Sequence, residues 1–133
     1  MKKHWVAFQD TQPCCPMTSW VHRSVDEKPW FQAQTCEPPR QTAVPGKGFP
    51  VFKVEFDGFT FEFSSIEEIK VCIETLSKRV LPRPIDLCRD LGTSSGPNSH
   101  WLSRLPANVK SWSYRQKAVT YLLKALRTFE QVT

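Results

Sequence analysis

The alternation of apolar and polar residues is strongest in residues 51–63. Apolar side chains occupy every second position of two short runs, which Asp57-Gly58 separates. Such alternation is typical of half-buried strands, and Asp-Gly is typical of a two-residue hairpin turn because both turn positions need positive φ. The resulting register puts the apolar side chains on one face, in the pairs Phe56–Phe59, Val54–Phe61 and Phe52–Phe63, with Lys53 opposite Glu62 on the other face.

A helix is predicted over residues 65–80, directly after the hairpin. Ser65 is the expected N-cap, and Glu68 completes a capping box. Lys78 and Arg79 are expected in the last turn, before Pro82 ends the helix. The apolar positions recur at helical spacing and form one stripe, made of Ile66, Ile69, Cys72, Ile73, Leu76 and Val80. The opposite side is typical of a solvated face, with the carboxylates Glu67, Glu68 and Glu74 near lysines.

A second helix is predicted over residues 113–129. Ser113 is the expected N-cap, and Gln116 occupies the matching capping-box position. The expected buried stripe consists of Tyr114, Ala118, Tyr121, Leu122, Ala125, Leu126 and Phe129. The opposite side is polar and mostly basic, with Lys117, Thr120, Lys124 and Arg127.

The N-terminal part of the chain is harder to interpret. Residues 3–8 predict a short strand, which can pair with either edge of the hairpin. Residues 9–50 form an irregular segment rich in proline, cysteine and aromatic residues, in which 19–25 is the best candidate strand. The chain is therefore expected to be a single α+β domain, residues 1–133. The hairpin 51–63 and the N-terminal strand would form a small antiparallel sheet, and the helices 65–80 and 113–129 would pack on it.

The overall composition favours a soluble, cytoplasmic protein. No apolar run reaches the roughly 18–20 residues that span a bilayer, so we expect no membrane partner. The five cysteines are odd in number and lack a C-x-x-C pair, which favours reduced thiols. The metal ligands that zinc would need from Cys14, Cys15, His22 and Cys36 are wrongly spaced, and no metal or other cofactor is expected.

The net charge of +5 is unevenly distributed. Residues 1–90 carry 12 Lys and Arg against 12 Asp and Glu, whereas residues 91–133 carry six against the single acid Glu130. Clustered cations with interleaved aromatic residues suit nucleic acid, although the polar side of any amphipathic helix can be basic only to keep it solvated. The candidate residues for binding nucleic acid or another acidic partner are Arg104, Lys110, Trp112, Arg115, Lys117, Lys124 and Arg127, and Trp101 and Tyr114 are the neighbouring aromatics.

Catalytic patterns are weak. Ser94 or Ser95 with His100 and Asp90 supply the residue types of a nucleophilic triad, but no nucleophile-elbow sequence accompanies them. The loop 92–99 is rich in glycine and serine but lacks the phosphate-loop signature. No enzyme activity is therefore expected. Two functions stay open: a small binding protein that contacts nucleic acid or a nucleoprotein complex through its basic C-terminal region, and a protein-binding or inhibitor-type module that uses residues 9–50.

Overall fold

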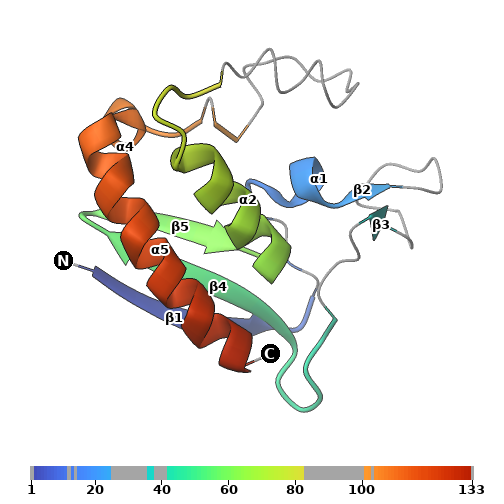
Figure 1. The fold of residues 1–133 in the computed structure, drawn as a ribbon. Coiled ribbons are helices and arrows are strands. Elements are labelled where there is room, and N and C mark those ends of the chain that lie inside the picture. The colour runs from blue at the N-terminus through green and yellow to red at the C-terminus, as the bar shows by residue number, and fades with distance from the viewer. Residues whose placement is uncertain are drawn as a thin grey trace.

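The computed structural model describes residues 2–11, 13, 15–24, 36–37, 42–82, 101–102 and 104–132. Its centre is an antiparallel sheet of three strands in the order β1-β4-β5, formed by β1 (Lys2–Gln9), β4 (Phe49–Phe56) and β5 (Phe59–Phe63) (Figure 1). The predicted N-terminal strand is confirmed, with one more residue at each end. It pairs with β4 along its whole length, which resolves the edge that the sequence left open.

The hairpin β4–β5 has the predicted register. Phe56 faces Phe59, Val54 faces Phe61, and Phe52 faces Phe63. The turn residues Asp57 and Gly58 have φ values of 48° and 86°, as a turn with two left-handed positions requires. On the opposite face the predicted charge pair is present, with Lys53 Nζ 3.3 Å from a Glu62 carboxylate oxygen.

Helix α2 (Ile66–Leu76) follows the hairpin and begins as predicted. Ser65 is its N-cap, and the Ser65 hydroxyl accepts a hydrogen bond of 3.3 Å from the Glu68 amide. The Glu68 carboxylate accepts from the Ser64 amide, one residue before the capping-box position. The predicted C-terminus was wrong, because α2 ends four residues early. Lys78 and Arg79 therefore lie beyond the helix, and Val80, predicted in the buried stripe, is 82% exposed.

Helix α5 (Trp112–Val132) is longer than predicted, and the short helix α4 (Ala107–Lys110) precedes it. Helix α5 begins at Trp112, one residue before the expected cap Ser113, and the hydroxyl of Ser111 accepts from the Tyr114 amide at 3.4 Å. The predicted stripe is confirmed. Tyr114 is half-buried, and the fully or nearly buried members are Ala118, Tyr121, Leu122, Ala125, Leu126 and Phe129.

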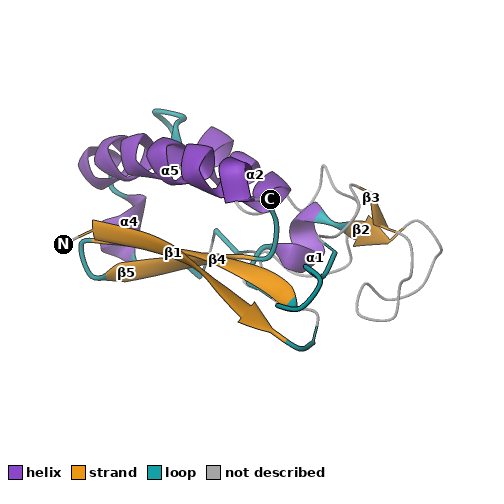
Figure 2. Ribbon diagram, turned by 90° about the horizontal axis from the view of Figure 1, so that it is seen from below, coloured by secondary structure: helices purple, strands orange, loops and turns teal. Residues whose placement is uncertain are grey.

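Both long helices lie on one face of the sheet, and the other face carries no helix in the part of the chain that is described (Figure 2). The phenylalanine face of the hairpin meets them there. The rings of Phe52 and Phe129, for example, have centroids 4.9 Å apart. Both predicted helices therefore pack on this sheet, as expected from the sequence. None of the described helices is long and apolar enough to cross a membrane.

The N-terminal irregular segment is described in part. Residues Thr18–Val21 form the short helix α1, so the strand expected over 19–25 was wrong except at its end. There β2 (Arg23–Ser24) pairs with β3 (Cys36–Glu37). The apolar side of α1 is used for tertiary packing, since Val21 joins the core and Trp20 packs against it. The catalytic candidates Asp90, Ser94, Ser95 and His100 and the loop 92–99 lie outside the described residues.

Candidate nucleic-acid interface

The basic face of α5 is exposed. Lys117, Thr120, Lys124 and Arg127 all lie on the side of the helix away from its buried stripe. Lys117 and Lys124 are separated by about 10 Å along the helix axis, and Arg127 lies about 4.5 Å further. Three cations of the predicted set therefore share one surface about 15 Å long.

These cations border a groove of about 700 Å³. A fourth cation, Lys2, reaches the groove from the first residue of β1, and its Nζ lies 5.5 Å from the centroid of the Tyr121 ring. The groove is lined by Lys2, Phe56, Lys117, Thr120, Tyr121, Leu123, Lys124 and Arg127. Four of these eight residues are cationic and none is acidic, so the lining attracts anions.

The neutral lining is largely carbon. Phe56 and Tyr121 belong to the core and present little surface, whereas Leu123 is 42% exposed. Long lysine side chains can themselves cover apolar surface while their charges stay in water. The groove therefore combines a cationic border with an apolar floor, an arrangement that can hold both a phosphate and the carbon skeleton attached to it.

The positive potential of the groove affects a neighbouring histidine. His4 of β1 hydrogen-bonds through Nδ1 to the Tyr121 hydroxyl, 2.7 Å away. Burial, and then the charge of Lys124, lower the pKa of the His4 imidazole below its ordinary value of 6.5. Asp57, at the hairpin turn, is an acidic group that acts on the neighbouring part of α5. Burial, and then the charge of Asp57, raise the pKa of Tyr114 to about 12.

Arg115, although predicted as a binding residue, does not belong to this groove. Its side chain is 4% exposed, and its guanidinium donates to four main-chain carbonyl groups. Lys110 accepts from Nε at 2.8 Å; Leu76, Lys78 and Arg79 accept from the two terminal nitrogens. Burial lowers the pKa of Arg115. The guanidinium is buried and uses four of its five N–H groups on carbonyls near the ends of α2 and α4, away from the groove.

The other predicted residues lie apart from the groove. Trp112 is half-buried, with the guanidinium groups of Arg115 and Arg79 at 5.0 and 6.0 Å from its ring centroid. Arg104 is exposed in the turn before α4, and Lys110 is half-buried at the end of α4. The neighbouring aromatics Trp101 and Tyr114 both make contacts within the fold. Trp101 is 5% exposed within the core, and the Tyr114 hydroxyl donates to the Phe56 carbonyl at 2.8 Å.

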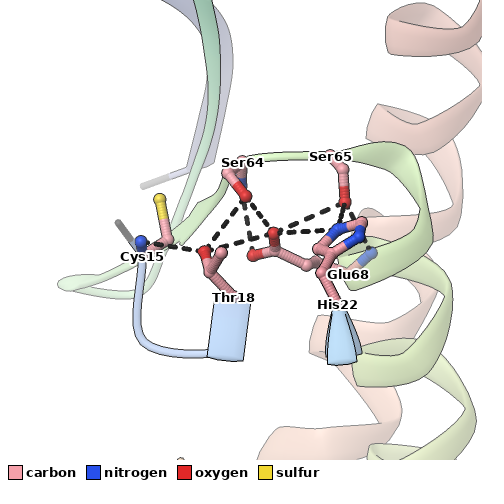
Figure 3. Close-up of polar contacts among 6 residues, drawn as sticks. All are labelled: Cys15, Thr18, His22, Ser64, Ser65 and Glu68. Carbon is pink, nitrogen blue, oxygen red and sulfur yellow. Dashed lines mark hydrogen bonds and ion pairs between the residues drawn. The ribbon is translucent and has the colours of Figure 1, made fainter. Parts of the chain in front are cut away.

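A second polar cluster is buried between α1 and the start of α2 (Figure 3). The Glu68 carboxylate, wrongly predicted on a solvated face, is fully buried and accepts from the Thr18 hydroxyl at 3.3 Å and the Ser64 amide at 3.1 Å. The Ser64 hydroxyl also donates to it. The Thr18 hydroxyl in turn accepts from the Cys15 amide at 3.0 Å. The cluster thus ties the N-terminal segment to α2.

The same cluster contains serine, histidine and glutamate without the geometry of a nucleophilic triad. Both the Ser65 hydroxyl, at 2.6 Å, and the Glu68 carboxylate, at 3.4 Å, approach Nε2 of His22 (Figure 3). In a triad the carboxylate and the hydroxyl contact different ring nitrogens. All three side chains are also fully buried, so a substrate has no approach to them. The cluster is a structural network.

Cys15 and Cys72 are buried as well. Both are free thiols, and burial raises the pKa of Cys72. Across the described ranges, no group of three His, Cys, Asp or Glu side chains could hold a metal ion. Cys14 lies outside those ranges, so the zinc interpretation is tested only in part.

Sequence reasoning missed Lys2, His4 and the aromatic partner Tyr121 as members of one site. Neither Lys2 nor His4 stands out in the sequence as a binding residue. They join the site because β1 pairs with β4, which places Lys2 and His4 opposite Phe56 and Val54 on the helix-covered face.

Comparisons with known proteins found no similar protein. No protein-family model, no curated protein and no solved structure matches the chain.

Proposed function

We propose that this protein binds nucleic acid, alone or in a nucleoprotein complex, through the basic groove between α5 and the start of β1. One observation carries the proposal. Four cations from two elements distant in sequence, Lys2 on β1 and Lys117, Lys124 and Arg127 on α5, line one groove without a carboxylate among the lining residues. If the basic residues of α5 served only to keep that helix face solvated, a lysine from another element, such as Lys2, would not be expected to line the same groove.

The chemistry of phosphate backbones supports this assignment. Each phosphate neutralised by a lysine or arginine releases condensed counterions, which provides most of the sequence-independent affinity. Arginine can also bind a phosphate through two parallel hydrogen bonds. The apolar floor with the exposed Leu123 can contact sugar or base. We propose binding without catalysis, since the buried Ser65–His22–Glu68 group is closed to substrates.

The test is binding of the full chain to fluorescently labelled single-stranded and duplex oligonucleotides over a range of salt concentrations. Neutralising four phosphates of a single strand predicts a slope of log K against log salt of about −3. The triple variant K117E/K124E/R127E should lose most of this affinity. The control is K47E/K70E/K78E, which changes the net charge equally at exposed lysines outside the groove. Equal losses in the two variants, or binding insensitive to salt, would contradict the groove as the site.

The alternative, a protein-binding or inhibitor-type module, would use residues 9–50. Part of that segment, residues 12, 14, 25–35 and 38–41, lies outside the described residues, and no observation favours it over the groove. It stays a prediction.

A further inference from the structure

We infer that binding of a phosphate group in the groove is coupled to proton uptake by His4, and that the Tyr121 hydroxyl connects the two. The inference rests on the proposed function and adds a means of control to it. Nucleic-acid backbones carry no group that titrates near neutral pH, so any pH dependence of this kind would belong to the protein.

The geometry places His4 directly behind the groove. Its Nδ1 lies 2.7 Å from the hydroxyl of Tyr121, whose ring forms part of the groove lining. The His4 ring also packs edge-on against the rings of Tyr121 and Phe129, with centroids 5.4 and 5.6 Å away. These contacts hold the imidazole against α5, so a change in its protonation directly changes its hydrogen bond with Tyr121.

The groups that face His4 are cationic or neutral. From α5 these are Lys124 and the Tyr121 hydroxyl; from β1, Lys2 lies two residues away on the same face. The β4 residue opposite His4 is Val54, and its neighbours on that face, Phe52 and Phe56, are also apolar. No carboxylate belongs to this set. Burial and the charge of Lys124 accordingly lower the pKa of His4, so the imidazole of the free protein is mainly neutral at pH 7.

A phosphate beside Lys124 reverses this balance. Its negative charge offsets the lysine and favours the imidazolium form of His4. The imidazolium donates from Nδ1, so the Tyr121 oxygen becomes the acceptor of that hydrogen bond. The Tyr121 hydrogen is then free to donate into the groove, toward a phosphate oxygen. By linkage, a proton on His4 tightens phosphate binding to the same extent that phosphate tightens proton binding.

The experiment measures the affinity of the full chain for a labelled oligothymidine strand between about pH 5 and pH 8 at constant ionic strength. The affinity of the wild type should rise as the pH falls, by at most about tenfold per pH unit, the limit for one proton. His4→Gln should remove this slope. Tyr121→Phe should reduce the gain in affinity on acidification.

A second readout needs no substitution. The His4 ring protons, followed by NMR in the wild-type protein, should titrate at a higher pH when oligothymidine is bound. An unchanged His4 titration, or an equal pH slope in wild type and His4→Gln, would overturn the coupling. Strong, salt-dependent binding that K117E/K124E/R127E removes, but that does not vary with pH, would overturn the coupling and leave the proposed function intact. Absence of binding at every pH would overturn both.

Discussion

The guanidinium of Arg115 donates a hydrogen bond of 3.1 Å to the carbonyl oxygen of Leu76, the last residue of α2. The carbonyls of Lys78 and Arg79 accept from the same guanidinium. The last carbonyls of a helix have no hydrogen-bond donor within the helix. At the end of α2, a side chain of α5 provides the donor for the Leu76 carbonyl. This contact joins α2 and α5, the two helices that cover the sheet. It also explains why Arg115, one of the predicted binding residues, is not available to a ligand.

Arg115→Ala should therefore destabilise the fold by about 2–4 kcal/mol, because it leaves one buried and three partly buried carbonyl groups without this donor. Arg115→Lys should recover only part of this loss, since an ammonium group cannot reach the same carbonyls with a planar fork. Urea denaturation measures both. Arg104→Ala, at an exposed site, is the control and should stay within about 0.5 kcal/mol of wild type. If Arg115→Ala kept the stability of the wild type but bound oligonucleotides more weakly, Arg115 would be a binding residue and not a structural one.

Phe61→Ala tests the packing of the hairpin against the helices. Phe61 is 5% exposed and belongs to the main core, so removal of its ring should cost about 3–5 kcal/mol. The matched control is Val80→Ala. The sequence pattern also put Val80 in the core, whereas the structure leaves it 82% exposed; its substitution should hardly change the midpoint of thermal unfolding. Similar midpoints for both variants would contradict this core.

Local patterns predicted much of the fold. The hairpin register followed from alternation and from Asp57-Gly58, because both signals act over a few residues. The pairing of β1 with β4 and the early end of α2 were not predictable in this way. The first depends on which sheet edge the rest of the chain covers, and the second depends on Arg115, more than thirty residues further along the chain.

The candidate site was predictable to the same limited extent. Helical spacing placed Lys117, Lys124 and Arg127 together, since they share one helix face. Lys2 joins them only through the tertiary arrangement of β1 and α5. Glu68 shows the opposite limit. Its neighbour Glu67 is half-buried and Glu74 is exposed, and the capping-box position of Glu68 did not reveal that Thr18 and Ser64 bury its carboxylate.

Glu68→Ala should destabilise the protein by about 3 kcal/mol or more, because Thr18, Ser64 and the Ser64 amide would lose a buried acceptor. Glu74→Ala, on the exposed side of the same helix, is the control and should stay close to wild type. Chemical denaturation compares the two. Proteolysis adds a local readout, since loss of the cluster should make the α1 segment the first part of the chain to be cleaved. Equal stability of the two variants would contradict a structural role for the cluster.

The lowered pKa of His4 predicts how stability changes on acidification, without any ligand. The unfolded chain binds a proton at this histidine near its ordinary pKa of 6.5, whereas the folded protein binds it only at lower pH. Between these two values the unfolded state holds more protons, so stability falls as the pH drops below about 6.5. Above that range the two states are both neutral at His4, and the contribution of this group no longer changes.

The measurement is the unfolding midpoint of wild type and His4→Gln at several pH values from about 7.5 to 5. Titration of acidic groups affects both proteins, so the difference between them isolates His4. The wild type should lose more stability than the variant over this range, and the gap between them should be constant above neutrality. A parallel decline would mean that the proton on His4 costs nothing in the folded state, in which case neither burial nor the positive charge of Lys124 lowers its pKa.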